Sequence, residues 1–267
     1  MKIAILGSGY VGTALANHWK HAGHTITLST RSPAKAAALA QSADRVQVLH
    51  GADITGLIQF LKDQEALILC QAADSQAAYE ETYLGTAKAL TAVLPHDPQL
   101  KHIIYTSSTS VYGEHQGAMV DETTPLIATH TPNQYLIAAE EHLFKLSNPS
   151  CSVCILRLGE IHGPGRQIAD RLKKMQGQSL PGTGDSITNL THLDDIVGAC
   201  DFALKQRLSG IFNLCSDLHI PRRELYALIC AQENLPLFTW DPSKKNIHAS
   251  NKIVSNAKIK AAGYTLF

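Results

Sequence analysis

The 267-residue sequence has no apolar run approaching the ~20 residues that a membrane-spanning helix requires. Charge is also scarce and balanced, since charged residues make up 17% of the chain and 23 basic side chains match 23 acidic ones. Nucleic acids and anionic membranes both select basic surfaces, so neither is expected as a partner. Repeats, low-complexity tracts and charged tails are absent, whereas the 45% of apolar residues support a large core. The sequence therefore predicts an ordinary globular protein.

A secretory signal is not indicated either, because the first apolar run stops at Gly7 without a small-residue cleavage pattern. Cys151 and Cys154 have the spacing of a redox pair, but the surrounding segment is typical of a strand rather than of a helix start. The cysteines lie mostly inside apolar runs, as reduced core cysteines do. We therefore expect a cytoplasmic location.

Short β-branched or aliphatic runs alternate with amphipathic stretches along most of the chain. Strands are expected at Lys2–Leu6, Thr25–Ser29, Arg45–Leu49, Ala66–Gln71, His102–Ser107, Ser152–Leu158 and Gly210–Leu214. Helices are expected at Tyr10–Ala22, Pro33–Ser42, Gln76–Leu94 and Ile196–Lys205. This alternation predicts the α/β class, with a doubly wound parallel sheet of the Rossmann type.

Glycine- and proline-rich breaks near residues 163–165 and 180–184, and a weakly periodic segment after Gln232, predict a smaller second unit. We expect residues 1–158 plus 189–215 to form the larger Rossmann domain. Residues 159–188 plus 216–267 are expected to form a small C-terminal substrate-binding cap.

The segment Gly7-Ser8-Gly9-Tyr10-Val11-Gly12 follows the first predicted strand directly and opens a helix. Gly7 permits the tight turn, Gly9 lets the backbone approach a pyrophosphate, and Gly12 lets helix and strand pack closely. The helix N-terminus then offers free N–H groups to the phosphates. This context predicts a dinucleotide site that includes all six residues.

The end of the second predicted strand indicates which dinucleotide is preferred. An NAD enzyme places an acidic residue there, but this chain has Thr30 and Arg31, with Lys35 one helical turn further. A guanidinium pairs with a 2′-phosphate, so NADP is predicted over NAD. The alternative is that Arg31 is only a solvated loop charge.

Three later strand ends complete the predicted cofactor edge. Asp53, after the third strand, is expected either to accept from the adenine amino group or to cap a helix. Gln71 and Ala72, after the fourth strand, supply backbone close to the cofactor, and Thr106 lies on the fifth strand. Glu160 and His162, at the end of another strand, are predicted to contact substrate because ligands of open sheets bind there. No metal site is expected.

Several segments together resemble the extended short-chain dehydrogenase/reductase superfamily, and within it the NAD(P)-dependent epimerase/dehydratase family. The motifs occur in the family's order and spacing at Gly7–Gly12, Ile104–Gly113, Asp121–Pro125, Tyr135, Arg157–Gly165 and Thr191–Asp195. The shorter length points to the atypical, YeeZ-type bacterial subgroup.

The resemblance implies a Ser–Tyr–Lys catalytic set, in which Ser108 matches the serine and Tyr135 the tyrosine. Ser108 would hydrogen-bond the reacting oxygen, and Tyr135 would exchange a proton with it while the nicotinamide carries hydride. The lysine position is Ala139. The sequence departs from the family pattern at two further positions. Thr82 stands where many relatives have an asparagine, and Glu160 stands where sugar-modifying relatives have an asparagine that contacts substrate.

Two functions are favoured, and a third, an RNA- or protein-binding scaffold with an unused Rossmann cleft, is disfavoured because the sequence has no basic patch. One is an NADP-dependent epimerase/dehydratase-like oxidoreductase that acts on a small or sugar-nucleotide-type substrate, favoured by Ser108 and Tyr135. The other is a catalytically silent NADP-binding sensor, favoured by Ala139. The resemblance also implies a homodimer formed through the helices expected at Gln76–Leu94 and Asn133–Leu146.

Overall fold

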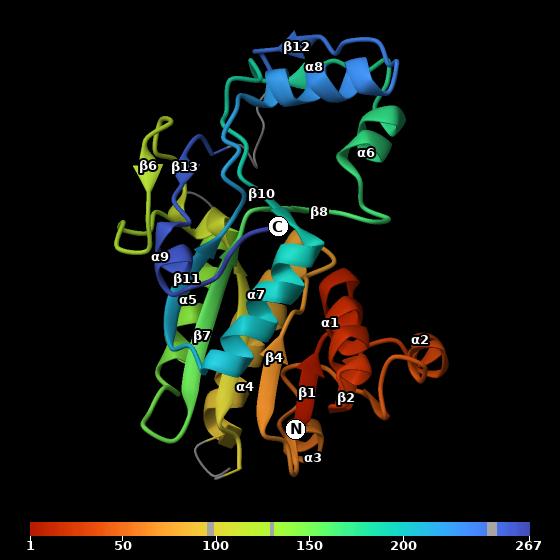
Figure 1. Cartoon of the computed structure of the whole chain (residues 1–267), viewed down its shortest axis with the longest axis vertical. Coiled ribbons are helices and arrows are strands. Elements are labelled where there is room, and N and C mark those ends of the chain that lie inside the picture. Colours follow the sequence, from red (N-terminus) through yellow and green to blue (C-terminus); the bar gives the residue numbers. More distant parts are fainter. Residues whose placement is uncertain (95–98, 129–130, 245–249) are drawn as a thin grey trace.

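The computed structural model describes residues 1–94, 99–128, 131–244 and 250–267. Its centre is a seven-stranded sheet in the order β11-β7-β5-β4-β1-β2-β3, in which every neighbouring pair is parallel (Figure 1). The strands are β1 (Lys2–Leu6), β2 (Thr25–Thr30), β3 (Arg45–Val48), β4 (Ala66–Leu69), β5 (His102–Ser108), β7 (Ser152–Leu158) and β11 (Gly210–Leu214). This arrangement confirms the predicted Rossmann-like fold.

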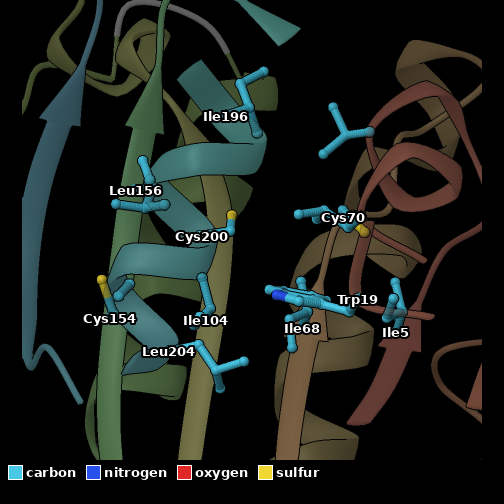
Figure 2. Close-up of a cluster of buried hydrophobic side chains, with 14 of the residues drawn as sticks. Ile5, Trp19, Ile68, Cys70, Ile104, Cys154, Leu156, Ile196, Cys200 and Leu204 are labelled. Atoms are coloured by element: carbon cyan, nitrogen blue, oxygen red, sulfur yellow. The ribbon is translucent and has the colours of Figure 1, made fainter. Parts of the chain in front are cut away.

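Helices cover both faces of the sheet because successive strand residues point to opposite sides. On one face, Ile3 and Ile5 join a core with α1 (Tyr10–His21) and α7 (Leu193–Gln206), as Figure 2 shows around Trp19 and Cys200. On the other face, Ala4 and Leu6 join a core with α3 (Ile54–Leu61), α4 (Thr86–Val93) and α5 (Thr131–Phe144). Shorter elements are α2 (Pro33–Leu39), a π-helical segment η2 (Glu80–Gly85), and 3₁₀ turns η1 (Gln76–Ala78) and η4 (Thr109–Tyr112).

A smaller cap lies beyond the carboxyl ends of the strands (Figure 1). Its core contains Leu172, Leu180, Tyr226 and Cys230, all buried. Two short parallel pairs and two helices build it and join it to the sheet: β8 (Glu160–His162) with β10 (Leu190–His192), β9 (Leu180–Pro181) with β12 (Trp240–Asp241), α6 (Ile168–Lys174) and α8 (Arg222–Gln232).

The end of the chain packs differently from the predicted cap range. Strand β13 (Ile253–Val254) pairs with β6 (Met119–Val120), and α9 (Ala257–Ala261) follows it. Ile259 and Tyr264 are buried in the core of the large sheet, not in that of the cap. The chain after β13 therefore belongs to the unit of the large sheet and not to the cap.

Five of the six cysteines are buried, and Cys151 is partly exposed. Burial raises the pKa of the Cys154 thiol to about 12, so the Cys151/Cys154 spacing belongs to a strand and not to a redox pair. Within the described ranges, no helix is long and apolar enough to cross a membrane.

Candidate dinucleotide and substrate site

The Gly-rich segment lies at the carboxyl end of β1, with β4 on one side and β2 on the other. Gly7 has a φ of 115°, a backbone conformation that side chains other than glycine rarely adopt. A Cβ on Gly12 would lie 1.8 Å from the Gly7 carbonyl oxygen. Both glycines are therefore required by the turn and by the packing of α1.

Gly9 is different, because a Cβ built there meets no protein atom within 4 Å. Its backbone, with φ −79° and ψ −163°, is one that any residue adopts. Gly9 is also the N-cap of α1, whose first turn carries no acidic side chain. Free N–H groups beside open space form a cradle that a phosphate fits and a side chain would fill. The residues present therefore fit the pyrophosphate of a dinucleotide.

Arg31 extends from the end of β2 towards the loop after β4. One guanidinium nitrogen lies 2.6 Å from an Asp74 carboxylate oxygen and 3.5 Å from the Ala72 carbonyl oxygen. Lys35 is exposed on α2, and Thr30 is buried. Two cationic side chains thus lie at the strand end where the ribose 2′ position is expected, and one of them has a carboxylate partner.

Asp53 caps a helix, since its Oδ1 accepts from the Gly56 N–H of α3 at 3.1 Å. Thr106 donates its hydroxyl proton to the Leu69 carbonyl at 3.1 Å and so ties the ends of β5 and β4 together. Gln71 follows β4 beside the Gly-rich turn. The cofactor roles of these three residues remain predictions.

Ser108 ends β5, and its Oγ accepts from the Ser110 N–H at 3.1 Å. In the described part of the chain no acceptor takes the Ser108 hydroxyl proton, which is therefore available to a ligand oxygen. Tyr135, on α5, hydrogen-bonds the side chain of Glu80 at the start of η2. That hydrogen bond, more than burial, raises the pKa of Tyr135 above its usual value. A proton-transferring tyrosine needs the opposite shift.

Ala139 is 1% exposed and belongs to the core between α5 and the sheet. Leu136 and Leu143, one turn before and one turn after it, are buried as well. The fourth residue after Tyr135 therefore points into the sheet core. A lysine placed at this position would enter the apolar core.

Glu160 contacts two cap arginines rather than standing free. Its carboxylate lies 2.5 Å from Arg171 of α6 and 3.6 Å from Arg222 of α8. His162 lies against His192 of β10, with ring centroids 5.1 Å apart. Burial, and then the neighbouring His192, lower the pKa of His162. Both predicted substrate residues lie where the cap joins the sheet.

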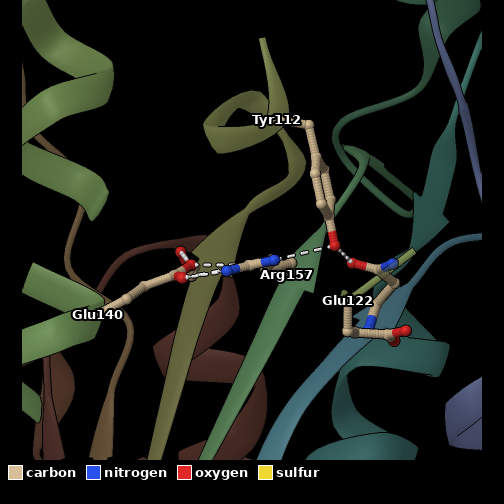
Figure 3. A network of polar contacts seen from close by, with 6 residues as sticks. Tyr112, Glu122, Glu140 and Arg157 are labelled. Carbon is tan, nitrogen blue, oxygen red and sulfur yellow. Dashed lines mark hydrogen bonds and ion pairs between the residues drawn. The ribbon is translucent and has the colours of Figure 1, made fainter. Parts of the chain in front are cut away.

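A buried polar network connects α5 to β7, η4 and β11 (Figure 3). Arg157 of β7 makes a two-pronged pair with Glu140 of α5, with nitrogen–oxygen distances of 2.7 and 3.1 Å. Its other nitrogen donates to the Tyr112 hydroxyl at 2.9 Å, and that hydroxyl donates to Asn213 at 2.7 Å. Glu140 also accepts from Ser107, the neighbour of Ser108, at 2.5 Å.

The sequence analysis did not predict this network, although the sequence contains one indication of it, an arginine within an apolar strand. Arg157 lies within the apolar strand Ser152–Leu158, and a buried guanidinium requires a buried acceptor. Burial alone would lower the pKa of Arg157, but the hydrogen bonds and charge of Glu140 raise it overall. The guanidinium stays charged and joins β7 to α5, and the Ser107–Glu140 hydrogen bond joins the end of β5 to the same helix.

The fold and the Gly-rich turn after β1 are those of the α/β class in which dinucleotide-binding proteins occur. The model of the NAD dependent epimerase/dehydratase family matches residues 3–215. The chain is also 33% identical over 232 residues to Protein YeeZ of Escherichia coli (strain K12), which covers 84% of this chain and 81% of that protein. The chain therefore belongs to the NAD-dependent epimerase/dehydratase family, as its motifs predicted.

Solved structures agree on the fold. A functionally unknown conserved protein from Silicibacter pomeroyi has a TM-score of 0.83 and 25% identity, covering 99% of this chain and 93% of its own. UDP-glucuronic acid 4-epimerase from Bacillus cereus, in complex with UDP-glucuronic acid and NAD, also has a TM-score of 0.83, at 17% identity. That similarity covers 98% of this chain and 92% of the epimerase.

Proposed function

We propose that the protein is an NADP-binding oxidoreductase of the epimerase/dehydratase type that acts on a small or sugar-nucleotide-type substrate. The open space at Gly9, beside the N-terminus of α1, is the observation that carries the dinucleotide part of this proposal. Arg31 and Lys35, with no acidic residue at the end of β2, support NADP over NAD. Structural relatives bound to UDP-sugars and NAD support the substrate class.

In this proposal Gly7–Gly12 binds the pyrophosphate, and Arg31 binds the 2′-phosphate. A bound nicotinamide supplies the hydride acceptor or donor. Ser108 donates its hydroxyl proton to the reacting substrate oxygen and orients it. Tyr135 exchanges the proton of that oxygen, and Glu80 slows this step because it holds the phenol protonated.

The cofactor preference is tested by titrating NADPH and NADH into the protein in a calorimeter. A charge-assisted contact between Arg31 and the phosphate contributes on the order of 1.5–3 kcal/mol, so NADPH should bind about tenfold more tightly or better. Arg31→Ala should remove most of that preference. Equal affinities in the native protein, or an unchanged preference in Arg31→Ala, would overturn the assignment.

A catalytically silent NADP sensor is the second candidate, and the raised pKa of Tyr135 together with the buried Ala139 favours it. Hydride transfer between NADPH and ketosugar nucleotides, measured against pH, separates the two. An enzyme that uses Tyr135 should accelerate towards alkaline pH and lose this rise in Tyr135→Phe. Absence of turnover with intact NADPH binding supports the sensor.

Location and assembly are further parts of the proposal. A cytoplasmic location is supported by the burial of five of the six cysteines, since buried cysteines of this kind are typical of reduced core residues. The expected homodimer through Gln76–Leu94 and Asn133–Leu146 stays a prediction.

A further inference from the structure

An ion pair joins Arg31 and Asp74 beyond the carboxyl ends of the strands. Arg31 follows β2 and Asp74 follows β4, and β1 lies between these two strands in the sheet. The pair therefore passes over the carboxyl end of β1, where the Gly-rich segment begins. Its 2.6 Å distance and the second contact to the Ala72 carbonyl draw the guanidinium towards β4.

The Asp74 carboxylate contacts Arg31 where a phosphate group would otherwise bind. A carboxylate and a phosphate both accept from the same fork of guanidinium N–H groups. A dianionic phosphate bound by Arg31 would lie within a few ångströms of the Asp74 carboxylate, and like charges at that distance repel. The Asp74 side chain is 79% exposed, so it can move into solvent when Arg31 changes partner.

We propose that Asp74 is a specificity-determining residue for the dinucleotide: it holds Arg31 in the cofactor-free protein and is displaced by the 2′-phosphate of NADP. NAD lacks that phosphate and leaves the ion pair intact. The pair therefore weakens NADP binding selectively and sets the size of the NADP preference. This inference rests on the proposed function, because it requires that the crevice bind dinucleotides through Arg31.

If the 2′-phosphate replaces Asp74 as the partner of Arg31, removal of the Asp74 carboxylate should change the affinity for NADPH but not that for NADH. Exposed ion pairs contribute little, and removal of the carboxylate also removes its repulsion of the phosphate, so Asp74→Asn should strengthen NADPH binding roughly three- to tenfold. NADH binding should change less than about twofold, since no phosphate competes for Arg31. In an Arg31→Ala background, Asp74→Asn should strengthen NADPH binding by less than about twofold, because the ion pair is already absent and only the direct repulsion of the phosphate is relieved.

Calorimetric titration of NADPH and NADH into the native protein, Asp74→Asn, Arg31→Ala and the double variant measures these effects. Asp185→Asn is the matched control, since Asp185 forms a comparable exposed pair with Arg223 in the cap, at 2.5 Å. That control should leave both affinities unchanged.

Weaker NADPH binding in Asp74→Asn would overturn the inference, because it would make Asp74 part of the cofactor site. An equal gain in the Arg31→Ala background would also overturn it, because the effect would then be general charge repulsion. In both cases the proposed function survives. Failure of the native protein to bind either dinucleotide is a distinct result that removes the proposed function and this inference together.

Discussion

At the scale of single residues, Ala139 shows how burial limits what a position can do. Its side chain is 1% exposed and packs among apolar groups of α5 and the sheet. Ala138, the preceding residue on the same helix, is only partly buried. A lysine at position 139 would place an ammonium group in an apolar core, where it would lose its hydration.

Ala139→Lys should therefore destabilise the protein by at least about 2 kcal/mol, through overpacking and the buried charge. Ala138→Lys, on a more exposed face of the same helix, should change the unfolding free energy by less than about 0.5 kcal/mol. Urea unfolding of both variants measures the difference. Comparable stabilities would mean that position 139 does not face the core.

His102 is a second residue whose surroundings decide its chemistry. The ring is 1% exposed, and its Nε2 donates to the Leu208 carbonyl oxygen at 3.0 Å. Burial lowers the pKa of His102 to about 4, only partly offset by that hydrogen bond. The usual pKa of about 6.5 applies in the unfolded chain.

Between pH 6.5 and 4 the unfolded chain therefore binds a proton at this site that the folded protein does not. The free energy of unfolding should fall as pH falls through this range, by about 2 kcal/mol between pH 7 and pH 5. His102→Gln should remove this part of the pH dependence. Identical pH slopes for the native protein and the variant, measured by denaturant unfolding, would contradict it.

At the scale of secondary-structure elements, the Arg157–Glu140 pair joins α5 to β7, and Tyr112 extends the contact to η4 (Figure 3). Both charged side chains are almost fully buried. A buried pair stabilises little overall against an apolar replacement, but the loss of one partner leaves an uncompensated charge. The network thus specifies how these elements dock.

Arg157→Met should cost about 3–5 kcal/mol of unfolding free energy, because it leaves the Glu140 carboxylate buried without its partner. The double variant Arg157→Met/Glu140→Leu should recover a large part of that loss. Chemical unfolding of the native protein and the single and double variants measures the coupling. Strictly additive losses would show that the two side chains do not act as a pair.

Local patterns predicted most elements well, because strand composition and glycine chemistry act over short ranges. The sheet, the Gly7–Gly12 turn and α1 follow from such patterns. The Tyr112–Arg157 network and the return of α9 to the main core depend on contacts between residues far apart in the chain, which no local pattern encodes. For the same reason, sequence spacing alone did not reveal that Ala139 faces the core or that Asp74 meets Arg31.

At the scale of the whole molecule, polar contacts join the cap to the Gly-rich end of the sheet. Tyr10 of α1 donates to the Pro164 carbonyl at 2.9 Å, and the Arg166 guanidinium lies 5.8 Å from the Tyr10 ring centroid. Glu160 anchors Arg171 and Arg222 from the cap helices. Tyr10 of the Gly-rich segment and Glu160 of β8 therefore both contact residues that lead into or belong to the cap.

The central claim is that the space at Gly9 holds the pyrophosphate of NADP, and titration of NADPH into the native protein and Gly9→Val tests it most directly. No protein atom lies within 4 Å of the added Cβ, so the variant should fold and unfold like the native protein. The native protein should bind one NADPH per chain, and Gly9→Val should bind none, because its side chain fills the phosphate position. Undiminished NADPH binding by folded Gly9→Val, or no binding by the native protein, would contradict the account.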